Sequence, residues 1–259
     1  GTDAIIVCGT TGESSTLTHE EHLDTIKYCV DKVAKRIPVV AGTGSNCTDT
    51  AVYLSQEAEK YGVDGILLVS PYYNKATQKG LYRHFKTVAD SVKVPAILYN
   101  VPSRTTLEIL PDTLRRLIPS GRFIALKEAS ANLSLVLEKL DAIDGRLTLY
   151  SGNDDLTYPL LAMGAQGVIS VVSNVLPGEM AALCQAYFDG DAQDSLRRQI
   201  RLMSFIRALF REVSPIPCKC AMEMMGQCSG ELRLPLIPAA EETRMALKKC
   251  LTELGYLKN

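Results

Sequence analysis

The sequence has no large excess of charge of either sign. It carries 28 lysines and arginines against 29 aspartates and glutamates, so its formal net charge is -1. It therefore lacks the basic field that nucleic acid binding requires, and no acidic run marks a disordered segment. No apolar stretch is long enough to span a bilayer, and no signal peptide is recognisable. We expect a soluble protein that acts neither on nucleic acid nor at a membrane.

Patterns typical of metal sites and disulfide frameworks are also lacking. The 8 cysteines are scattered, and several lie in apolar patterns where a free thiol behaves as a small hydrophobe. Cys218, Cys220 and Cys228 do not have the paired spacing of a zinc site. His19 and His22 flank two glutamates, in an order that differs from the zinc-protease motif. We expect no metal site and a reduced, cytoplasmic setting.

Strand and helix patterns alternate along most of the chain. A capping box of Thr18 and Glu21 begins the first helix. From Pro177 onward only helical patterns occur. Short apolar runs predict about seven strands, at residues 4–8, 38–41, 65–70, 96–99, 123–126, 147–151 and 167–171.

This alternation predicts an α/β fold, a (β/α)8 TIM barrel with a C-terminal helical extension. Residues 1–172 would form the barrel, and residues 173–259 its last helix and the helical region. Such a barrel has eight strands. Because the chain begins just before a strand, our hypothesis is that a first strand and helix are missing, so that residues 1–172 supply strands two to eight.

Lys127 lies where a buried strand ends. A lysine there has its stem in an apolar wall and its amine at the strand mouth. Partial desolvation disfavours the ammonium form and leaves more free amine to attack a carbonyl carbon. The alternative is a lysine whose amine merely reaches water.

Polar and glycine-rich loops follow the other strands, at the end where barrels of this kind carry their active sites. Gly9 and Gly12 let backbone amides approach an anion such as a carboxylate. An arginine beside a reactive lysine suits bidentate capture of a carboxylate. Each residue also has a structural reading, as a tight turn, a packing tyrosine or a solvated arginine. The side chains that we expect to meet Lys127 are Thr10, Thr11, Tyr72, Tyr73, Tyr99 and Arg104.

Together these segments resemble the dihydrodipicolinate synthase family. The resemblance runs in order along essentially the whole chain, which makes it more specific than any single motif. Members of that family begin with a strand and helix that would precede the first residue here. The matching segments are GTTGES (9–14), PYYN (71–74), YNVPSRT (99–105), ALKEA (125–129) and GVISV (167–171).

The resemblance implies a Schiff-base reaction in lysine and diaminopimelate biosynthesis. Lys127 would bind pyruvate covalently and turn its methyl carbon into an enamine, which adds to L-aspartate 4-semialdehyde to give 4-hydroxy-tetrahydrodipicolinate. Tyr99 would transfer protons at the lysine adduct, and Thr11 and Tyr73 would complete a hydrogen-bonded relay. Because the iminium is the electron sink, no metal or organic cofactor is expected.

The resemblance also implies substrate contacts and an assembly. Thr10 and Thr11 would hold the pyruvate carboxylate, Arg104 the carboxylate of the aldehyde, and the Ile169 carbonyl would line the pocket. Tyr73 would reach into the site of a neighbouring subunit. The expected assembly is a homotetramer built from two tight dimers.

Two alternatives remain open from the sequence. A lyase for 2-keto-acid sugars, resembling N-acetylneuraminate lyase, shares the lysine, the tyrosine and the glycine turn, but it lacks an arginine at the step of Arg104. A catalytically silent barrel that binds a small acid would have no need of the full set of Thr11, Tyr73, Tyr99, Arg104 and Lys127.

A possible allosteric site for L-lysine follows from the same resemblance. One acidic residue that contacts the inhibitor in lysine-inhibited relatives is replaced here by Thr50, which predicts weak or absent inhibition. The residues that resemble that site are Ser14, Ser15, His19, His22, Asn46 and Tyr72.

Overall fold

The protein is described by a computed structural model that covers residues 1–258. Two compact units are present. The sheet unit comprises residues 3–9 and 17–169, and the helical unit comprises residues 1–2, 10–16 and 170 onward. The main change of unit along the chain falls between residues 169 and 170.

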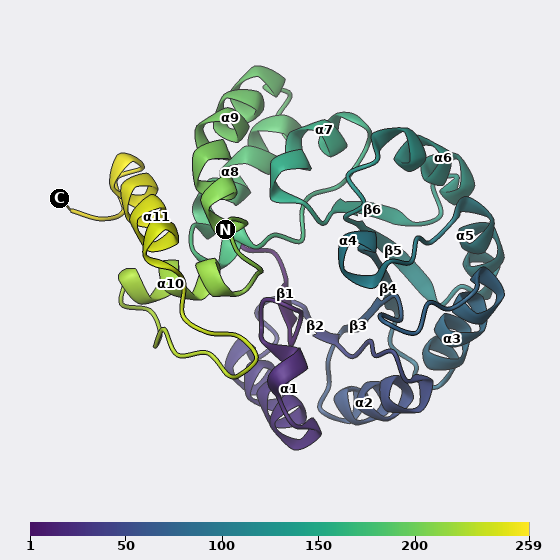
Figure 1. The fold of residues 1–259 in the computed structure, drawn as a ribbon. Coiled ribbons are helices and arrows are strands. Elements are labelled where there is room, and N and C mark those ends of the chain that lie inside the picture. Colours follow the sequence, from purple (N-terminus) through teal and green to yellow (C-terminus); the bar gives the residue numbers. More distant parts are fainter. Residues whose placement is uncertain (259) are drawn as a thin grey trace. The chain divides into compact units, whose positions relative to one another are not determined.

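The sheet unit is an α/β structure. Within residues 1–258 it holds a 6-stranded sheet in which every neighbouring pair is parallel and the strand order follows the chain. Its helices lie along the outer side of the curled sheet (Figure 1). The strands are β1 (Ile5–Val7), β2 (Val39–Gly42), β3 (Gly65–Val69), β4 (Ala96–Asn100), β5 (Phe123–Glu128) and β6 (Thr148–Ser151).

The first helix of this unit begins at the capping box that the sequence predicts. The capping box at the start of α1 is formed, with Thr18 and Glu21 each accepting the other's backbone N–H. Four short helices, α4, η2, η3 and α7, complete the unit. The α-helices and 3-10 helices are α1 (His19–Val33), α2 (Thr48–Lys60), α3 (Gln78–Asp90), α4 (Pro102–Thr105), α5 (Pro111–Leu117), η2 (Ile118–Ser120), α6 (Leu133–Ile143), η3 (Asp154–Leu156) and α7 (Thr157–Ala162).

The predicted strand at residues 167–171 is not formed as a strand. Only an isolated parallel bridge joins Val168 to Ser151, although Ile169 N–H still donates to the Ser151 carbonyl at 2.8 Å. Gly167 has a φ of 143°, a conformation that favours glycine and interrupts the extended chain. The prediction of a strand here was wrong, because it rested on the apolar run and did not allow for the positive φ of Gly167.

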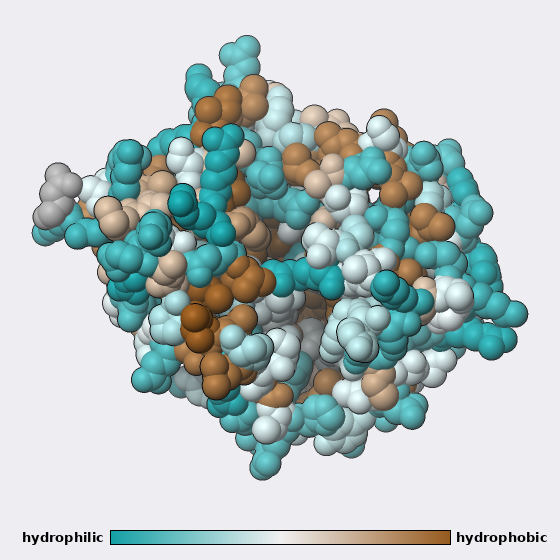
Figure 2. All heavy atoms as spheres, in the orientation of Figure 1, coloured by the Kyte–Doolittle hydropathy of each residue, from teal (hydrophilic) through white to brown (hydrophobic). Residues whose placement is uncertain are grey.

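The helical unit contains the segments that the sequence predicted as helices only. Figure 1 shows α8 beside α9 and α10 beside α11. In Figure 2 a hydrophobic patch lies over the segment between α10 and α11, where Leu234 and Ile237 are exposed. The helices are η1 (Ser14–Thr16), η4 (Val172–Asn174), α8 (Pro177–Phe188), α9 (Ala192–Leu209), α10 (Ile216–Met224) and α11 (Glu241–Glu253).

The two faces of the sheet carry different cores. The outer face packs against the helices through a large apolar cluster that includes Leu98 and Leu126. The inner face carries a smaller cluster that includes Ile97, Tyr99 and Ala125. Because neighbouring strand residues alternate between faces, a residue's place in the strand decides which cluster it joins.

Candidate functional site

Lys127 and Tyr99 stand opposite each other on neighbouring strands. They are register partners in the β4–β5 pair, each one residue before its strand ends. The Lys127 Nζ atom lies 4.2 Å from the centre of the Tyr99 ring. The prediction that these two side chains meet is confirmed by the geometry.

A β-bulge determines which face Lys127 occupies. Ala96 pairs with Phe123 and Ile97 pairs with Ala125, so Ile124 has no partner in β4. The extra residue shifts the alternation that Phe123 begins, and a bulge is a known means of re-aiming a side chain. Phe123 belongs to the outer cluster and Ala125 to the inner one. Lys127, two residues after Ala125, therefore shares the inner face with Tyr99.

The surroundings of Lys127 favour its neutral form. Burial is the largest cause that lowers its pKa from 10.5 to about 8. The positive charge of Arg104 acts in the same direction, and the negative charge of Asp154 opposes it. A pKa of about 8 leaves roughly a tenth of the amine uncharged at pH 7, roughly 300 times more than in an ordinary lysine.

The pKa of Tyr99 is shifted in the opposite direction. Tyr99 is buried, and burial raises its pKa to about 12, while Arg104 acts against this shift. Its hydroxyl therefore stays protonated at neutral pH and can donate a proton or a hydrogen bond. An amine with a lowered pKa beside a protonated phenol is an arrangement suited to attack on a carbonyl group with proton transfer.

Tyr73 and Arg104 lie on the surface of the sheet unit. The Tyr73 side chain is 90% exposed, and its backbone has a φ of 73°, which is uncommon for a residue other than glycine. Arg104 is exposed on α4, a short helix that the sequence analysis did not predict. Its positive charge acts to lower the pKa values of both Lys127 and Tyr99.

Thr10 and Thr11 belong to the helical unit. There the Thr11 Oγ1 atom lies 3.5 Å from the Ser214 Oγ atom. Nearby in sequence, the Glu13 carboxylate accepts a hydrogen bond of 2.6 Å from Lys219. Ile169 lies at the end of the sheet unit, partly buried.

The possible lysine-site residues are spread over both units. Ser14 and Ser15 lie in η1 of the helical unit. In the sheet unit the His19 ring lies 6.0 Å from the Tyr53 ring. His22 is buried with its Nε2 atom 2.8 Å from the Gly42 carbonyl oxygen.

The remaining two members of that set lie in neighbouring loops. The side chain of Asn74 donates to the Asn46 carbonyl at 2.9 Å, which joins the loop after β2 to the loop after β3. Tyr72, in the second of these loops, is 40% exposed.

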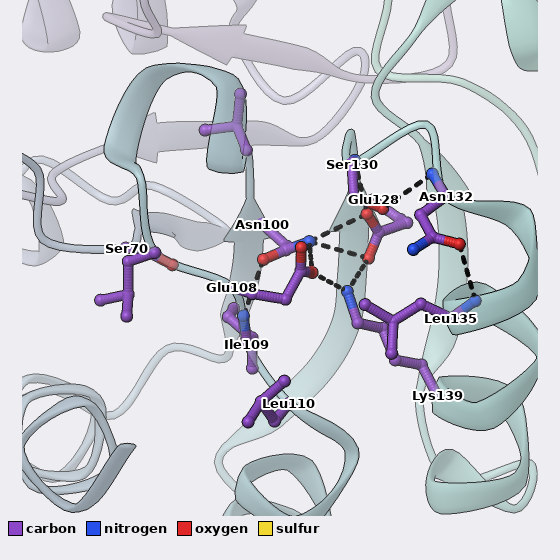
Figure 3. Close-up of polar contacts among 12 residues, drawn as sticks. Ser70, Asn100, Glu108, Ile109, Leu110, Glu128, Ser130, Asn132, Leu135 and Lys139 are labelled. Atoms are coloured by element: carbon purple, nitrogen blue, oxygen red, sulfur yellow. Dashed lines mark hydrogen bonds and ion pairs between the residues drawn. The ribbon is translucent and has the colours of Figure 1, made fainter. Parts of the chain in front are cut away.

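A cluster of four polar side chains was not predicted by the sequence analysis. Asn100, Glu108, Glu128 and Lys139 point toward one another on the outer side of the sheet (Figure 3). The available signal was Lys139, a lysine within the apolar stripe of α6 that otherwise buries Val136, Ala142 and Ile143.

Residues 1–258 contain no cluster of possible metal ligands and no helix that could span a membrane. In residues 1–258, no three His, Cys, Asp or Glu side chains are grouped so that they could hold a metal ion. Over the same residues, each helix is too short or too polar to cross a membrane. Within residues 1–258 the structure contains no disulfide bond.

Comparisons with known proteins agree with the geometry. The model of the dihydrodipicolinate synthetase family matches residues 1–254. The chain is 51% identical over 251 residues to the 4-hydroxy-tetrahydrodipicolinate synthase of Clostridium novyi (strain NT), covering 97% of this chain and 85% of the relative.

Solved structures give the same result. The dihydrodipicolinate synthase from Aquifex aeolicus matches with a TM-score of 0.97 and 46% identity, over 100% of this chain and 89% of that one. The chloride-inhibited dihydrodipicolinate synthase from Acinetobacter baumannii complexed with pyruvate matches with a TM-score of 0.96 and 40% identity. The match covers 99% of this chain and 88% of that one. The chain belongs to the dihydrodipicolinate synthetase family.

Proposed function

We propose that this chain is a lyase of the class I aldolase type that condenses pyruvate with L-aspartate 4-semialdehyde to give 4-hydroxy-tetrahydrodipicolinate, in lysine and diaminopimelate biosynthesis. The observation that carries the proposal is the placement of the Lys127 amine 4.2 Å from the Tyr99 ring centre, with its pKa lowered to about 8. The family's named relatives support the same reaction.

Lys127 acts as the nucleophile. Its neutral amine attacks the keto carbon of pyruvate, and water leaves as the iminium forms. Loss of a methyl proton gives an enamine, whose carbon forms a bond to the aldehyde carbon of the second substrate. The positive iminium nitrogen accepts the electron pair, so the reaction needs no metal or organic cofactor.

Tyr99 moves protons at this centre. Its phenol donates a proton to the oxygen that leaves as water and can recover one in a later step. Thr11 and Tyr73 extend this path as a hydrogen-bonded relay. The high pKa of Tyr99 supports the role of donor, because the hydroxyl is protonated before the reaction begins.

Carboxylate recognition falls to residues with matching chemistry. Thr10 and Thr11 bind the pyruvate carboxylate through hydroxyl and backbone donors. Arg104 binds the carboxylate of the aldehyde through its planar guanidinium group. The Ile169 carbonyl lines the pocket.

The assembly in this proposal is a homotetramer made of two tight dimers. Tyr73 enters the site of a neighbouring subunit, and two observations support an external contact. Its side chain is 90% exposed, and its backbone holds an unfavourable φ of 73°. Sedimentation velocity should give a tetramer, whereas a fully active monomer would contradict the contribution of Tyr73 from a partner.

The finer fold and the setting are part of the same proposal. We take the parallel sheet with its outer helices to follow the (β/α)8 barrel arrangement, supported by the TM-score of 0.97 to a family structure. A cytoplasmic location is supported by the 8 cysteines that form no disulfide among residues 1–258.

The response to L-lysine is proposed to be weak. The candidate site includes Ser14, Ser15, His19, Asn46 and Tyr72, with His22 beside them, but Thr50 supplies no carboxylate for the inhibitor's ammonium group. Near-complete inhibition by submillimolar L-lysine would contradict this part.

Substrate tests separate this function from its alternatives. The protein is incubated with pyruvate and aspartate semialdehyde, and separately with N-acetylneuraminate. Product from the first mixture alone supports the proposal. Cleavage of N-acetylneuraminate alone would indicate a sugar-acid lyase, and pyruvate binding without turnover a binding protein.

A further inference from the structure

A buried polar network lies behind the Lys127–Tyr99 pair. Glu128 follows Lys127 at the end of β5, and Asn100 follows Tyr99 at the end of β4. The Asn100 Nδ2 atom donates to both Glu128 oxygens, at 2.9 and 3.1 Å. These bonds join the two strand ends by side chains, on the face opposite Lys127.

Helix α6 and the segment before α5 complete the network. Lys139 of α6 donates to the Glu128 Oε2 atom at 2.6 Å and also pairs with Glu108. Glu108 accepts a further hydrogen bond of 2.5 Å from Asn100 Nδ2. Figure 3 shows the lysine amine between the two carboxylates.

Two backbone N–H groups also donate hydrogen bonds to the side chains of this network. The Ile109 N–H donates to Asn100 Oδ1 at 2.9 Å, and the Ser130 N–H donates to Glu128 Oε1 at 2.6 Å. Each side chain of the network is thus held in one orientation.

The Lys139–Glu128 ion pair is too deeply buried to touch a substrate. The side chains of Lys139 and Glu128 are 0% and 1% exposed. A buried ion pair contributes little net stability compared with an apolar pair of the same volume, because both charges lose their hydration. Its presence therefore calls for another role, and specifying one alignment is the best-attested role of such pairs.

The alignment that this network could specify is the register of β4 with β5. A slip of two residues would leave every side chain on its own face of the sheet, so the alternation of side chains alone does not exclude it. The Asn100–Glu128 hydrogen bonds exist only in the observed register, which is also the register that pairs Tyr99 with Lys127.

We propose that the Glu128–Lys139 ion pair, with Asn100 and Glu108, is a positioning device that holds Lys127 opposite Tyr99. This inference rests on the proposed role of Lys127 as the nucleophile. Lys139 and Glu128 are positioning residues, since neither contacts the reacting atoms.

The test replaces Lys139 by a neutral chain of similar length. Lys139→Met leaves Glu128 without its cation and loosens the end of β5. The protein is mixed with saturating pyruvate and borohydride at several pH values. The rate of adduct formation is then measured per folded molecule, with the adduct located by peptide mass spectrometry.

We expect adduct formation in Lys139→Met to be at least tenfold slower than in the unaltered protein. Its pH midpoint should move upward, because hydration of Lys127 removes the largest cause of its lowered pKa. The other groups that act on Lys127 are Tyr99 from β4, Arg104 from α4 and Asp154 from η3, and they stay unchanged. Lys86→Met, which removes an exposed pair with Asp90, is the matched control and should behave as the unaltered protein.

The outcomes separate the two claims. An adduct on Lys127 in the unaltered protein, with the same rate and midpoint in folded Lys139→Met, overturns the positioning role alone, even if the melting temperature falls. No adduct in the unaltered protein overturns the proposed function and this inference with it. If Lys139→Met does not fold, Glu108→Gln removes the partly exposed partner, and a change of about threefold in the same direction is expected. An unchanged Glu108→Gln then contradicts the inference.

Discussion

Lys127 and Tyr99 are paired across β4 and β5, and the amine of the first lies 4.2 Å from the ring centre of the second. The same burial acts on them in opposite senses, lowering the pKa of the lysine to about 8 and raising that of the tyrosine to about 12. Both shifts favour the neutral form, as burial of an ionisable group requires.

Removing the Tyr99 hydroxyl should slow the chemistry without unfolding the protein. Tyr99→Phe keeps the ring that packs in the inner cluster and loses the proton donor. We expect turnover with pyruvate and aspartate semialdehyde to fall roughly 100-fold, within the range for one general acid. Tyr28→Phe on the exposed face of α1 is the control, and equal loss in both variants would argue against a catalytic Tyr99.

The pH dependence of adduct formation should report the lysine. The rate with pyruvate should rise with pH up to about 8 and level off above it, as the ammonium loses its proton. Arg104→Met removes a charge that lowers the pKa and should move the midpoint up. Asp154→Asn removes a charge that raises the pKa and should move it down. Midpoints that stay the same, or move in the reverse order, would show that another group controls the rate.

His84 should make the protein sensitive to acid. It is buried between α2 and α3, with its Nδ1 atom 2.9 Å from Thr48 Oγ1 and, within residues 1–258, no hydrogen-bond partner at Nε2. Burial lowers its pKa from 6.5 to about 4. Below pH 6.5 the unfolded chain binds a proton that the folded protein does not, so the free energy of unfolding falls as the pH drops toward 4. The loss is about 3 kcal/mol at most.

Urea unfolding at pH 7 and at pH 4.5 measures this contribution. His84→Asn retains an acceptor for Thr48 and does not titrate, so its stability should change less between the two pH values. The exposed His19→Asn is the control and should leave the difference as it is in the unaltered protein. The account fails if His84→Asn loses as much stability on acidification.

Gly152 should not tolerate a side chain. A Cβ atom there would lie 2.8 Å from the Ala129 Cβ atom and 3.0 Å from the Glu128 carbonyl oxygen. Gly152→Ala must therefore push the loop after β6 away from the end of β5, at a cost of about 1–3 kcal/mol in unfolding free energy. Thermal unfolding should show the loss, together with slower adduct formation at Lys127.

Gly80→Ala supplies the contrast. Its Cβ atom would meet Oγ1 of Thr77, the N-cap residue of α3, at 3.5 Å, which is an ordinary contact. This variant should be neutral or slightly stabilised, because alanine reduces the entropy of the unfolded chain. Similar losses in both glycine variants would show that close packing at Gly152 is not the cause.

Much of the architecture was predictable because it depends on local signals. The Thr18–Glu21 capping box that the sequence predicts is formed at the start of α1. The approach of Lys127 to Tyr99 was also predictable, since parallel strand ends meet at one edge of a sheet.

The rest depends on contacts between distant residues. The partners of Lys139 cannot be identified from local sequence, because Glu108 and Glu128 are 31 and 11 positions away. The bulge at Ile124 has no local marker either, since it is defined by pairing with β4. The expected strand at residues 167–171 is reduced to a bridge by the backbone of Gly167.

Borohydride trapping with pyruvate, followed by peptide mass spectrometry, tests the central claim most directly. The account predicts a reduced pyruvate adduct on Lys127, and none in a folded Lys127→Arg variant, whose guanidinium stays charged. An adduct on another lysine, or no adduct in protein shown to be folded, would contradict the claim that Lys127 is the Schiff-base nucleophile.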